Sequence, residues 1–173
     1  CPRGSFSNFT FSNSFPFLKL LWLKFFISPF VKFINWHATS YLERNDILAR
    51  FPSSKVSIIN DGVDFQAFQN CQNYTRKELL KKYLSIDVKC VSNIFLSIGR
   101  LHKIKRFDIL IDAFSLYINN DQHAKLIIAG GNDGVEEELR KQIFDLKLEN
   151  SVFLIGSIDF DSKKIFLNNC DYF

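Results

Sequence analysis

The sequence predicts an α/β fold with a doubly wound parallel sheet, and two observations carry that prediction. From Tyr74 onward, short apolar runs alternate with longer segments whose apolar residues recur at helical spacing. The run from Leu126 to Ala129 is apolar at every position, which is typical of a strand covered by helices on both faces. Strands that alternate with helices form parallel sheets, because each helix returns the chain to the start of the next strand.

The individual elements follow from local patterns. We expect strands at residues 33–39, 55–59, 92–98, 124–129 and 152–155, and the start of another at 171–173. We expect helices at residues 40–48, 75–83, 104–118, 135–146 and 161–168. Ser40 and Glu43 have the spacing of a capping box, and Pro52 ends the helix that they begin. The Asn-Asp-Gly sequence at residues 60–62 predicts a turn.

Residues 14–36 are crowded with Phe, Leu and Trp, but lysines recur and prolines interrupt, so no apolar run is long enough to span a membrane. Two interpretations stay open. The segment is a helix packed on the sheet of a domain, with lysine stems flanking the core. Alternatively, it is a basic amphipathic helix that lies on an anionic membrane surface.

The composition limits the classes of function. The chain has 173 residues, 47% hydrophobic content and a net charge of +4, with basic and acidic residues interleaved, so we expect a globular protein that binds no nucleic acid. Cysteines 1, 71, 90 and 170 form no C-x-x-C pair, which excludes a metal-site or disulfide pattern and fits a reducing cytoplasm. Because the chain starts at cysteine, lacks methionine and stops in an expected strand, we expect a fragment cut at both ends.

The segment that follows the strand at residues 92–98 suits a phosphate group. Gly99 allows a tight turn, and Arg100 and Lys105 offer a bidentate fork and a mobile charge. The next helix would present free N–H groups to the same place. The open alternative is a solvated surface loop. Glycines at 130, 131 and 134 either bring backbone N–H groups to a nucleotide or form a tight turn. The three histidines are scattered, and only His102 lies in the phosphate loop.

Five blocks in order closely resemble the family-4 (group 1) glycosyltransferases, at residues 58–64, 99–105, 110–114, 125–130 and 152–156. Residues 1–4 and 36–40 also look like the later part of that family's first domain. The resemblance implies the glycosyltransferase-B fold, in which two Rossmann-like doubly wound domains face a cleft. Residues 1–58 would then be the end of the acceptor-side domain with its linker, and residues 59–173 a partial domain for the nucleotide-sugar donor.

The resemblance also implies roles for particular residues. Arg100 and Lys105 would bind the donor diphosphate and stabilise the leaving nucleotide, with no metal ion or other cofactor. Gly99 and Gly130 would lie near the nucleotide, Gly62 would form a turn near the cleft, and Val152 would lie in the segment that lines the base pocket. The sugar would pass, with retention of configuration, to a saccharide or lipid-linked acceptor. Surface polysaccharide or glycolipid synthesis at the cytoplasmic face of a membrane is the expected setting.

The chain departs from the family pattern in three ways. The family usually has proline and asparagine before the glycine of the turn, where this chain has Asn60 and Asp61, and glycine after the lysine, where it has Arg106. Arg106 would add a third cation beside the phosphate. The family's glutamate pair should follow Phe173, so we expect the chain by itself to be inactive and its parent to be an enzyme. Two alternatives stay open: a nucleotide-sugar epimerase and a binding protein of the same fold without catalysis.

Overall fold

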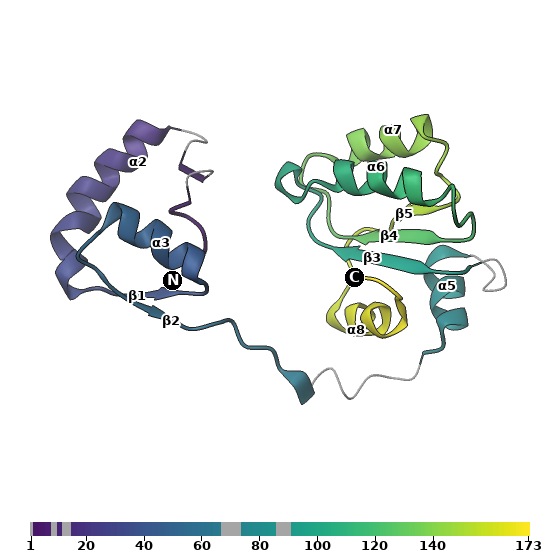
Figure 1. Cartoon of the computed structure of the whole chain (residues 1–173), viewed down its shortest axis with the longest axis horizontal. Coiled ribbons are helices and arrows are strands. Elements are labelled where there is room, and N and C mark those ends of the chain that lie inside the picture. Colours follow the sequence, from purple (N-terminus) through teal and green to yellow (C-terminus); the bar gives the residue numbers. More distant parts are fainter. Residues whose placement is uncertain (1, 8–9, 12–14, 67–73, 86–90) are drawn as a thin grey trace. The chain divides into compact units, whose positions relative to one another are not determined.

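The computed structural model describes residues 2–7, 10–11, 15–66, 74–85 and 91–173. The chain divides into two compact units, Cys1–Asp64 and Phe65–Phe173 (Figure 1). The domain boundary expected after residue 58 lies inside the first unit. Cysteines 1, 71 and 90 lie outside the described residues, and Cys170 is a free thiol.

The first unit is a small α/β layer. Its elements are α2 (Pro16–Trp22), a π-helical turn η1 (Leu23–Ile27), a 3-10 helix η2 (Ser28–Phe33), β1 (Asn35–Ala38), α3 (Tyr41–Arg50) and β2 (Lys55–Ile58). Strands β1 and β2 pair in parallel, from Asn35 opposite Lys55 to Ala38 opposite Ile58. Phe11, Leu23 and Phe51 form its buried apolar cluster, and Trp36 of β1 packs against them. The expected strands and the helix after Ser40 are confirmed.

Glu43, in the first turn of α3, holds the first unit together. Its side chain is only 6% exposed, and it accepts hydrogen bonds from the Thr39 N–H at 2.7 Å and the Gly4 N–H at 3.0 Å. Ser40 caps the helix by accepting from the Glu43 N–H at 3.2 Å. The reciprocal bond of the predicted capping box does not form, because the Glu43 carboxylate accepts from the N–H of Thr39 rather than that of Ser40. Burial works to raise the pKa of Glu43, but the hydrogen bonds from Thr39 and Gly4 outweigh it and hold the pKa below its ordinary value.

The prediction of a turn at residues 60–62 is wrong. No turn hydrogen bond closes this described segment, and Gly62 does not adopt a positive φ angle. The chain instead continues out of β2, with the Ile59 N–H donating to the Ala38 carbonyl at 2.9 Å. A reversal is not needed here because no antiparallel strand follows β2. Asp61 accepts an exposed hydrogen bond from Arg3 at 3.3 Å.

The second unit is a parallel sheet with helices on both faces. Its elements are α5 (Arg76–Leu84), β3 (Ile94–Ile98), a 3-10 turn η4 (Lys103–Lys105), α6 (Phe107–Tyr117), β4 (Lys125–Ala129), α7 (Glu136–Asp145), β5 (Val152–Leu154) and α8 (Phe160–Asn169). The strand order is β3-β4-β5. Leu126 lies opposite Phe95 on one side and Val152 on the other. Helices α6 and α7 cover one face, and α5 and α8 cover the other (Figure 1).

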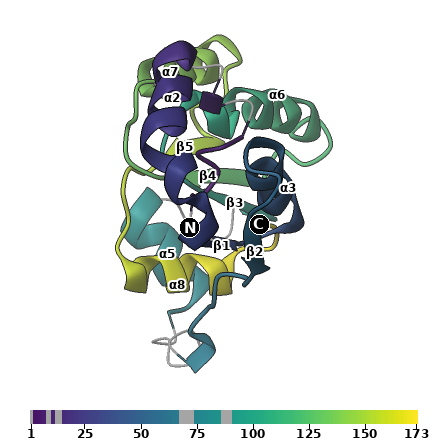
Figure 2. The same cartoon turned by 90° about the vertical axis from the view of Figure 1, so that its left-hand side faces the viewer.

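Central strand β4 supplies residues to both cores, and all five of its residues are buried. Leu126 and Ile128 join the cluster formed with α6 and α7, whereas Ile127 joins the cluster formed with α5 and α8. Helices α5 and α8 lie side by side in both views, and Leu80 and Phe166 meet in this second cluster (Figure 2). The doubly wound parallel sheet predicted from the sequence is thereby confirmed.

The end of the chain returns to the other side of β3. Ile94 and Leu96 hydrogen-bond to residues 171 and 172, with the Leu96 N–H 2.9 Å from the Tyr172 carbonyl. The expected beginning of a strand at 171–173 is therefore confirmed as a parallel bridge between Tyr172 and Phe95. Strands β4 and β5 add successively to one side of β3, and the chain then crosses back through α8 to the other side of β3. The carboxyl end of β3 is consequently the switch point, where ligands bind in such sheets.

Replacing Glu43 with glutamine should destabilise the first unit by about 1–3 kcal/mol at neutral pH, because an amide oxygen replaces a charged acceptor of two backbone N–H groups. Since folding lowers the pKa of Glu43, the wild-type advantage is complete above the ordinary glutamate range and is lost as the pH falls through the folded value. Thermal melts of both proteins against pH measure this, with Glu137→Gln on the exposed face of α7 as control. A difference that stays constant into the acid range would contradict the role of the charge.

Candidate functional site

The ladder between β3 and β4 continues past the ends of both strands. The Gly99 N–H donates to the Ala129 carbonyl at 2.9 Å, the Leu101 N–H to the Gly131 carbonyl at 2.8 Å, and the Asp133 N–H to the Leu101 carbonyl at 3.1 Å. Two loops, residues 99–102 and 130–133, are therefore held in register at the switch point. A site built on them is positioned by the sheet itself.

Gly130 is required by this pairing. A β-carbon added to Gly130 would overlap the carbonyl group of Gly99, and one added to Gly131 would come within 2.8 Å of the Ser157 hydroxyl. The Gly130 N–H donates to the Gly156 carbonyl at 2.8 Å. By contrast, the Gly131 N–H finds no acceptor in the described part of the chain. The structure thus requires glycine at residue 130 for close packing of the two loops, whereas a nucleotide-binding role for these glycines stays a prediction.

Arg100 follows directly after β3 and Gly99. Its side chain is 79% exposed and donates to the Asp133 carboxylate across the two paired loops at 2.8 Å. An exposed pair of this kind is worth less than about 1 kcal/mol, so a phosphate group can displace the carboxylate. Asp133 was not singled out from the sequence, because its contact with Arg100 depends on the register of β3 against β4.

Lys105 ends the 3-10 turn η4, and its aliphatic stem lies over Gly99. The Lys105 Cε atom is 3.5 Å from the position that a Gly99 β-carbon would occupy. The side chain is exposed, and among the described residues no carboxylate lies within ion-pair distance of it. His102 supports the turn: its Nδ1 accepts from the Ile104 N–H at 3.2 Å, and its carbonyl accepts from the Lys105 N–H at 2.8 Å. His102 is therefore a structural residue in this loop.

The helix expected from residue 104 is interrupted. Arg106 has φ 53°, in the left-handed region, so residues 103–105 form a 3-10 turn and α6 begins at Phe107. This explains why the family usually has glycine at this position, since glycine adopts positive φ without strain. Arg106 also forms a bidentate ion pair with Asp108, at 3.0 Å.

Asp108 changes the expected role of the α6 N-terminus. The side-chain hydrogen bond from Arg106 lowers the pKa of Asp108, and the backbone N–H of Ile109 adds to this effect. The start of α6 was expected to present free N–H groups to a phosphate, but it already faces this carboxylate. The Arg106 guanidinium, expected as a third cation beside a phosphate, is likewise paired with a carboxylate, that of Asp108.

Two predicted residues, Val152 and Gly62, lie in other parts of the chain. Val152 begins β5, at the amino edge of the sheet, and is buried in the core at 4% exposure. The structure thus places Val152 at the end of β5 opposite to the carboxyl edge, and its expected place in the segment that lines a base pocket stays a prediction. Gly156, which has φ 71°, follows the carboxyl end of β5 and so lies at the carboxyl edge of the sheet. Gly62 belongs to the first unit and is not part of this loop pair.

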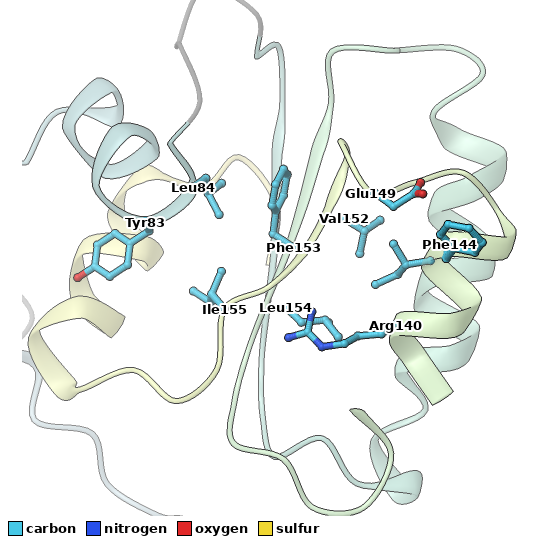
Figure 3. Close-up of a pocket in the computed structure, with 10 residues that line it drawn as sticks. Tyr83, Leu84, Arg140, Phe144, Glu149, Val152, Phe153, Leu154 and Ile155 are labelled. Atoms are coloured by element: carbon cyan, nitrogen blue, oxygen red, sulfur yellow. The ribbon is translucent and has the colours of Figure 1, made fainter. Parts of the chain in front are cut away.

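A second hollow follows the outer edge of β5. It has a volume of about 480 Å³ and lies between α5 and α7, with Tyr83 and Leu84 on one side and Arg140 and Phe144 on the other (Figure 3). Arg140 is already paired with Glu136 at 2.7 Å. This hollow contains none of the residues predicted to bind a ligand except Val152, whose buried side chain forms part of its floor. In the described residues, no group of three His, Cys, Asp or Glu side chains is arranged to hold a metal ion.

The second unit belongs to the class of doubly wound α/β domains, with an exposed arginine and an exposed lysine in the loop after its first strand. The model of the family described as "Glycosyl transferases group 1" matches residues 85–173. The chain therefore belongs to the group 1 glycosyl transferases, which confirms the family recognised from its sequence blocks.

Relatives and solved structures agree with this assignment. The chain is 26% identical over 152 residues to the alpha-1,3/1,6-mannosyltransferase ALG2 of Dictyostelium discoideum, covering 79% of this chain and 36% of that protein. It is 26% identical to TarM, with a TM-score of 0.57 over 78% of this chain and 24% of TarM. Anabaena HepE in complex with UDP and glucose shares the fold, at 21% identity and a TM-score of 0.66 over 86% of this chain and 40% of HepE. The chain thus spans about a third of the curated relative that it matches.

Replacing Gly130 with alanine should destabilise the second unit by about 1–3 kcal/mol, because the added methyl group forces the Gly99 loop away from β4. Urea unfolding followed by circular dichroism measures this. Gly62→Ala is the matched control, since open space surrounds Gly62 and its φ is not positive, so its effect should stay within about 0.5 kcal/mol. Equal midpoints for the two variants would show that the loops do not need the close contact.

Replacing Asp133 with asparagine should strengthen binding of a nucleoside diphosphate by up to about fivefold, because Arg100 no longer has to leave a carboxylate. Calorimetric titration with UDP measures the change. The comparison is repeated in an Arg100→Ala background, where the gain should shrink. If Asp133→Asn strengthens binding equally with and without Arg100, the ion pair does not restrain that arginine.

Proposed function

We propose that this chain carries the donor-binding site of a glycosyltransferase that moves a sugar from a nucleotide-diphosphate sugar to a saccharide or lipid-linked acceptor. The observation that carries the proposal is the placement of Arg100 and Lys105 on one loop at the switch point, with Gly131 offering an N–H from the neighbouring loop. Family membership supports it. Retention of anomeric configuration, expected from the family resemblance, is part of the proposal.

The chemistry follows from where charge develops. As the sugar leaves the donor, the nucleoside diphosphate gains negative charge on its phosphate oxygens. Arg100 would donate two parallel hydrogen bonds to these oxygens, and the Lys105 ammonium would add a point charge. Both groups stand on a loop fixed by the β3–β4 ladder, so little reorganisation is needed as the charge grows. Such fixed cations replace the divalent ion that a diphosphate leaving group would otherwise require.

Uridine is the first base to test. TarM and HepE have both been solved with UDP, and each shares this fold. The Dictyostelium relative is named a mannosyltransferase, so mannose is a sugar to compare with glucose and N-acetylglucosamine. The base pocket would be formed by the segment after β5, around Gly156 and Ser157, because it follows the carboxyl end of that strand.

The proposal about the acceptor rests on comparison with longer relatives, of which this chain covers 36% and 24%. We place the activity in synthesis of a surface polysaccharide or glycolipid at the cytoplasmic face of a membrane. A lipid-linked acceptor would require the enzyme to work at the bilayer surface. No described helix is long and apolar enough to cross a membrane.

Replacing Arg100 or Lys105 with alanine should each weaken UDP binding by roughly 10- to 100-fold, since a hydrogen bond to a charged group contributes about 1.5–3 kcal/mol. Isothermal titration calorimetry with UDP, and with GDP and ADP for comparison, measures the loss. Lys103→Ala is the matched control, because Lys103 is an exposed lysine in the same 3-10 turn and lacks the position over Gly99. Its effect should be less than about threefold if long-range charge alone acts.

Two results would contradict the proposal. If Lys103→Ala weakens binding as much as Lys105→Ala, the loop acts only through its total charge and holds no defined phosphate site. If none of the three diphosphates binds to a chain whose circular dichroism and melting are normal, the second unit is not a donor site.

A further inference from the structure

The loop after β3 is supported in two different ways along its length. Leu101 is buried, and its N–H and carbonyl both pair with the loop that follows β4. Beyond Leu101 the chain leaves the sheet, and the next residue that enters a core is Phe107. Lys105 lies between these two anchors, in residues 102–106, so the sheet itself does not hold it in place.

Two of the three hydrogen bonds that close residues 102–106 end on His102. Its carbonyl accepts from the Lys105 N–H at 2.8 Å, and its ring Nδ1 accepts from the Ile104 N–H at 3.2 Å. The third joins the Arg106 N–H to the Lys103 carbonyl at 3.3 Å. Of the side chains in this described stretch, only that of His102 bonds to the backbone of the turn.

The ring nitrogen that caps the turn must be unprotonated. A backbone N–H only donates, so Nδ1 of His102 can accept it only in a neutral ring that carries its proton on Nε2. The cap satisfies an N–H that the short turn η4 leaves without a carbonyl partner, and it thereby fixes the backbone of the residues that follow. His102 is half-buried, and within the described residues its Nε2 atom has no hydrogen-bond partner.

The turn determines where the Lys105 side chain lies. The Lys105 Cε and Cδ atoms are 3.5 and 3.7 Å from the position that a Gly99 β-carbon would occupy, and the Phe107 ring is 3.6 Å from the same position. The stem therefore runs back from η4 to the end of β3. If η4 unwound, the stem would lose this contact and the ammonium group would sample a larger volume, which makes binding of an anion more costly in entropy.

We infer that His102 is a positioning residue of the proposed donor site: its Nδ1 atom caps η4 and so holds the Lys105 ammonium where a donor phosphate would lie. This inference rests on the proposed function. Arg100 does not depend on the cap, because it precedes the turn and its guanidinium is held by Asp133 at 2.8 Å. The two cations are thus held by different means, one by a carboxylate and the other by a capped turn.

Three substitutions of His102 distinguish the two ring nitrogens. The asparagine side-chain oxygen reaches the place of Nδ1, the glutamine amide reaches the place of Nε2, and alanine reaches neither. His102→Asn should bind UDP within about twofold of the wild type, whereas His102→Ala and His102→Gln should each bind about three- to tenfold more weakly, the effect of one lost hydrogen bond. Isothermal titration calorimetry on the full chain measures these affinities.

His123→Ala is the matched control. His123 is exposed at the amino edge of the same sheet, just before β4, and in the described residues only its backbone makes hydrogen bonds. Removing its ring should change UDP affinity less than about twofold, since only a distant charge effect remains.

The cap acts through Lys105, so its effect should vanish when the lysine is absent. In a Lys105→Ala background, His102→Ala should change UDP affinity less than about twofold, whereas in an Arg100→Ala background it should cost about three- to tenfold, as in the wild type. Titrations followed by the NMR shifts of amides in the second unit suit these weak affinities. A general loss of stability would weaken binding alike in both backgrounds and would not produce this difference.

The ring can also be observed directly, without any nucleotide. Long-range ¹H–¹⁵N spectra of the free chain at about pH 8, where histidine is ordinarily neutral, should show the His102 proton on Nε2. The Ile104 amide should exchange faster with solvent in His102→Ala but not in His102→Asn, because only the first variant lacks an acceptor for it.

Several results would overturn the inference. Wild-type affinity in His102→Ala would show that the turn holds Lys105 without the cap. Tight binding by His102→Gln with weak binding by His102→Asn would assign Nε2 a direct contact with the ligand. An equal loss in both backgrounds, or a ring proton on Nδ1, would also contradict it. In each of these cases the wild type still binds UDP, so the proposed function stands. A folded wild-type chain that binds no nucleotide contradicts the proposed function and the inference with it.

Discussion

The close approach of Gly130 to the carbonyl of Gly99 sets the geometry of the second unit at the carboxyl edge of its sheet. Only a residue without a side chain lets β3 and β4 remain paired beyond their ends. Because the pairing persists, the loop with Arg100 and Lys105 has a fixed position relative to the loop with Gly131 and Asp133. Two segments about thirty residues apart in the chain become one rigid binding surface, and the precision comes from backbone hydrogen bonds.

This arrangement depends on β4 being buried on both faces. The alternation of Leu126 and Ile128 with Ile127 locks the strand between two separate cores, and a shift by one residue would exchange the faces. Such a shift would also move Gly130 away from Gly99. Core packing at the middle of the sheet therefore fixes the register of the loops at its edge.

Apolar periodicity predicted the strands, the helices and the parallel order, because burial on both faces leaves a clear pattern at residues 124–129. Arg100 and Gly130 could be placed at the carboxyl edge because they follow closely after strands, and Lys105 because it lies in the loop that leaves the first of these strands. For Val152, resemblance identified a segment but not which end of its strand the residue occupies. Asp133 and Asp108 were missed because their partners depend on strand register and on the left-handed conformation of Arg106, neither of which leaves a periodic signal.

Two of the cations on the loop after β3 already pair with carboxylates. Asp133 occupies Arg100, and Asp108 occupies Arg106. In the proposed donor site, binding of a diphosphate would exchange one anion for another at Arg100, whereas Lys105 would gain a new partner. The contribution of Arg100 to the binding free energy would be smaller than its hydrogen bonds to phosphate suggest, because the ion pair with Asp133 must first be broken. In return, Asp133 holds the guanidinium over the loop, so less side-chain entropy is lost when the phosphate arrives.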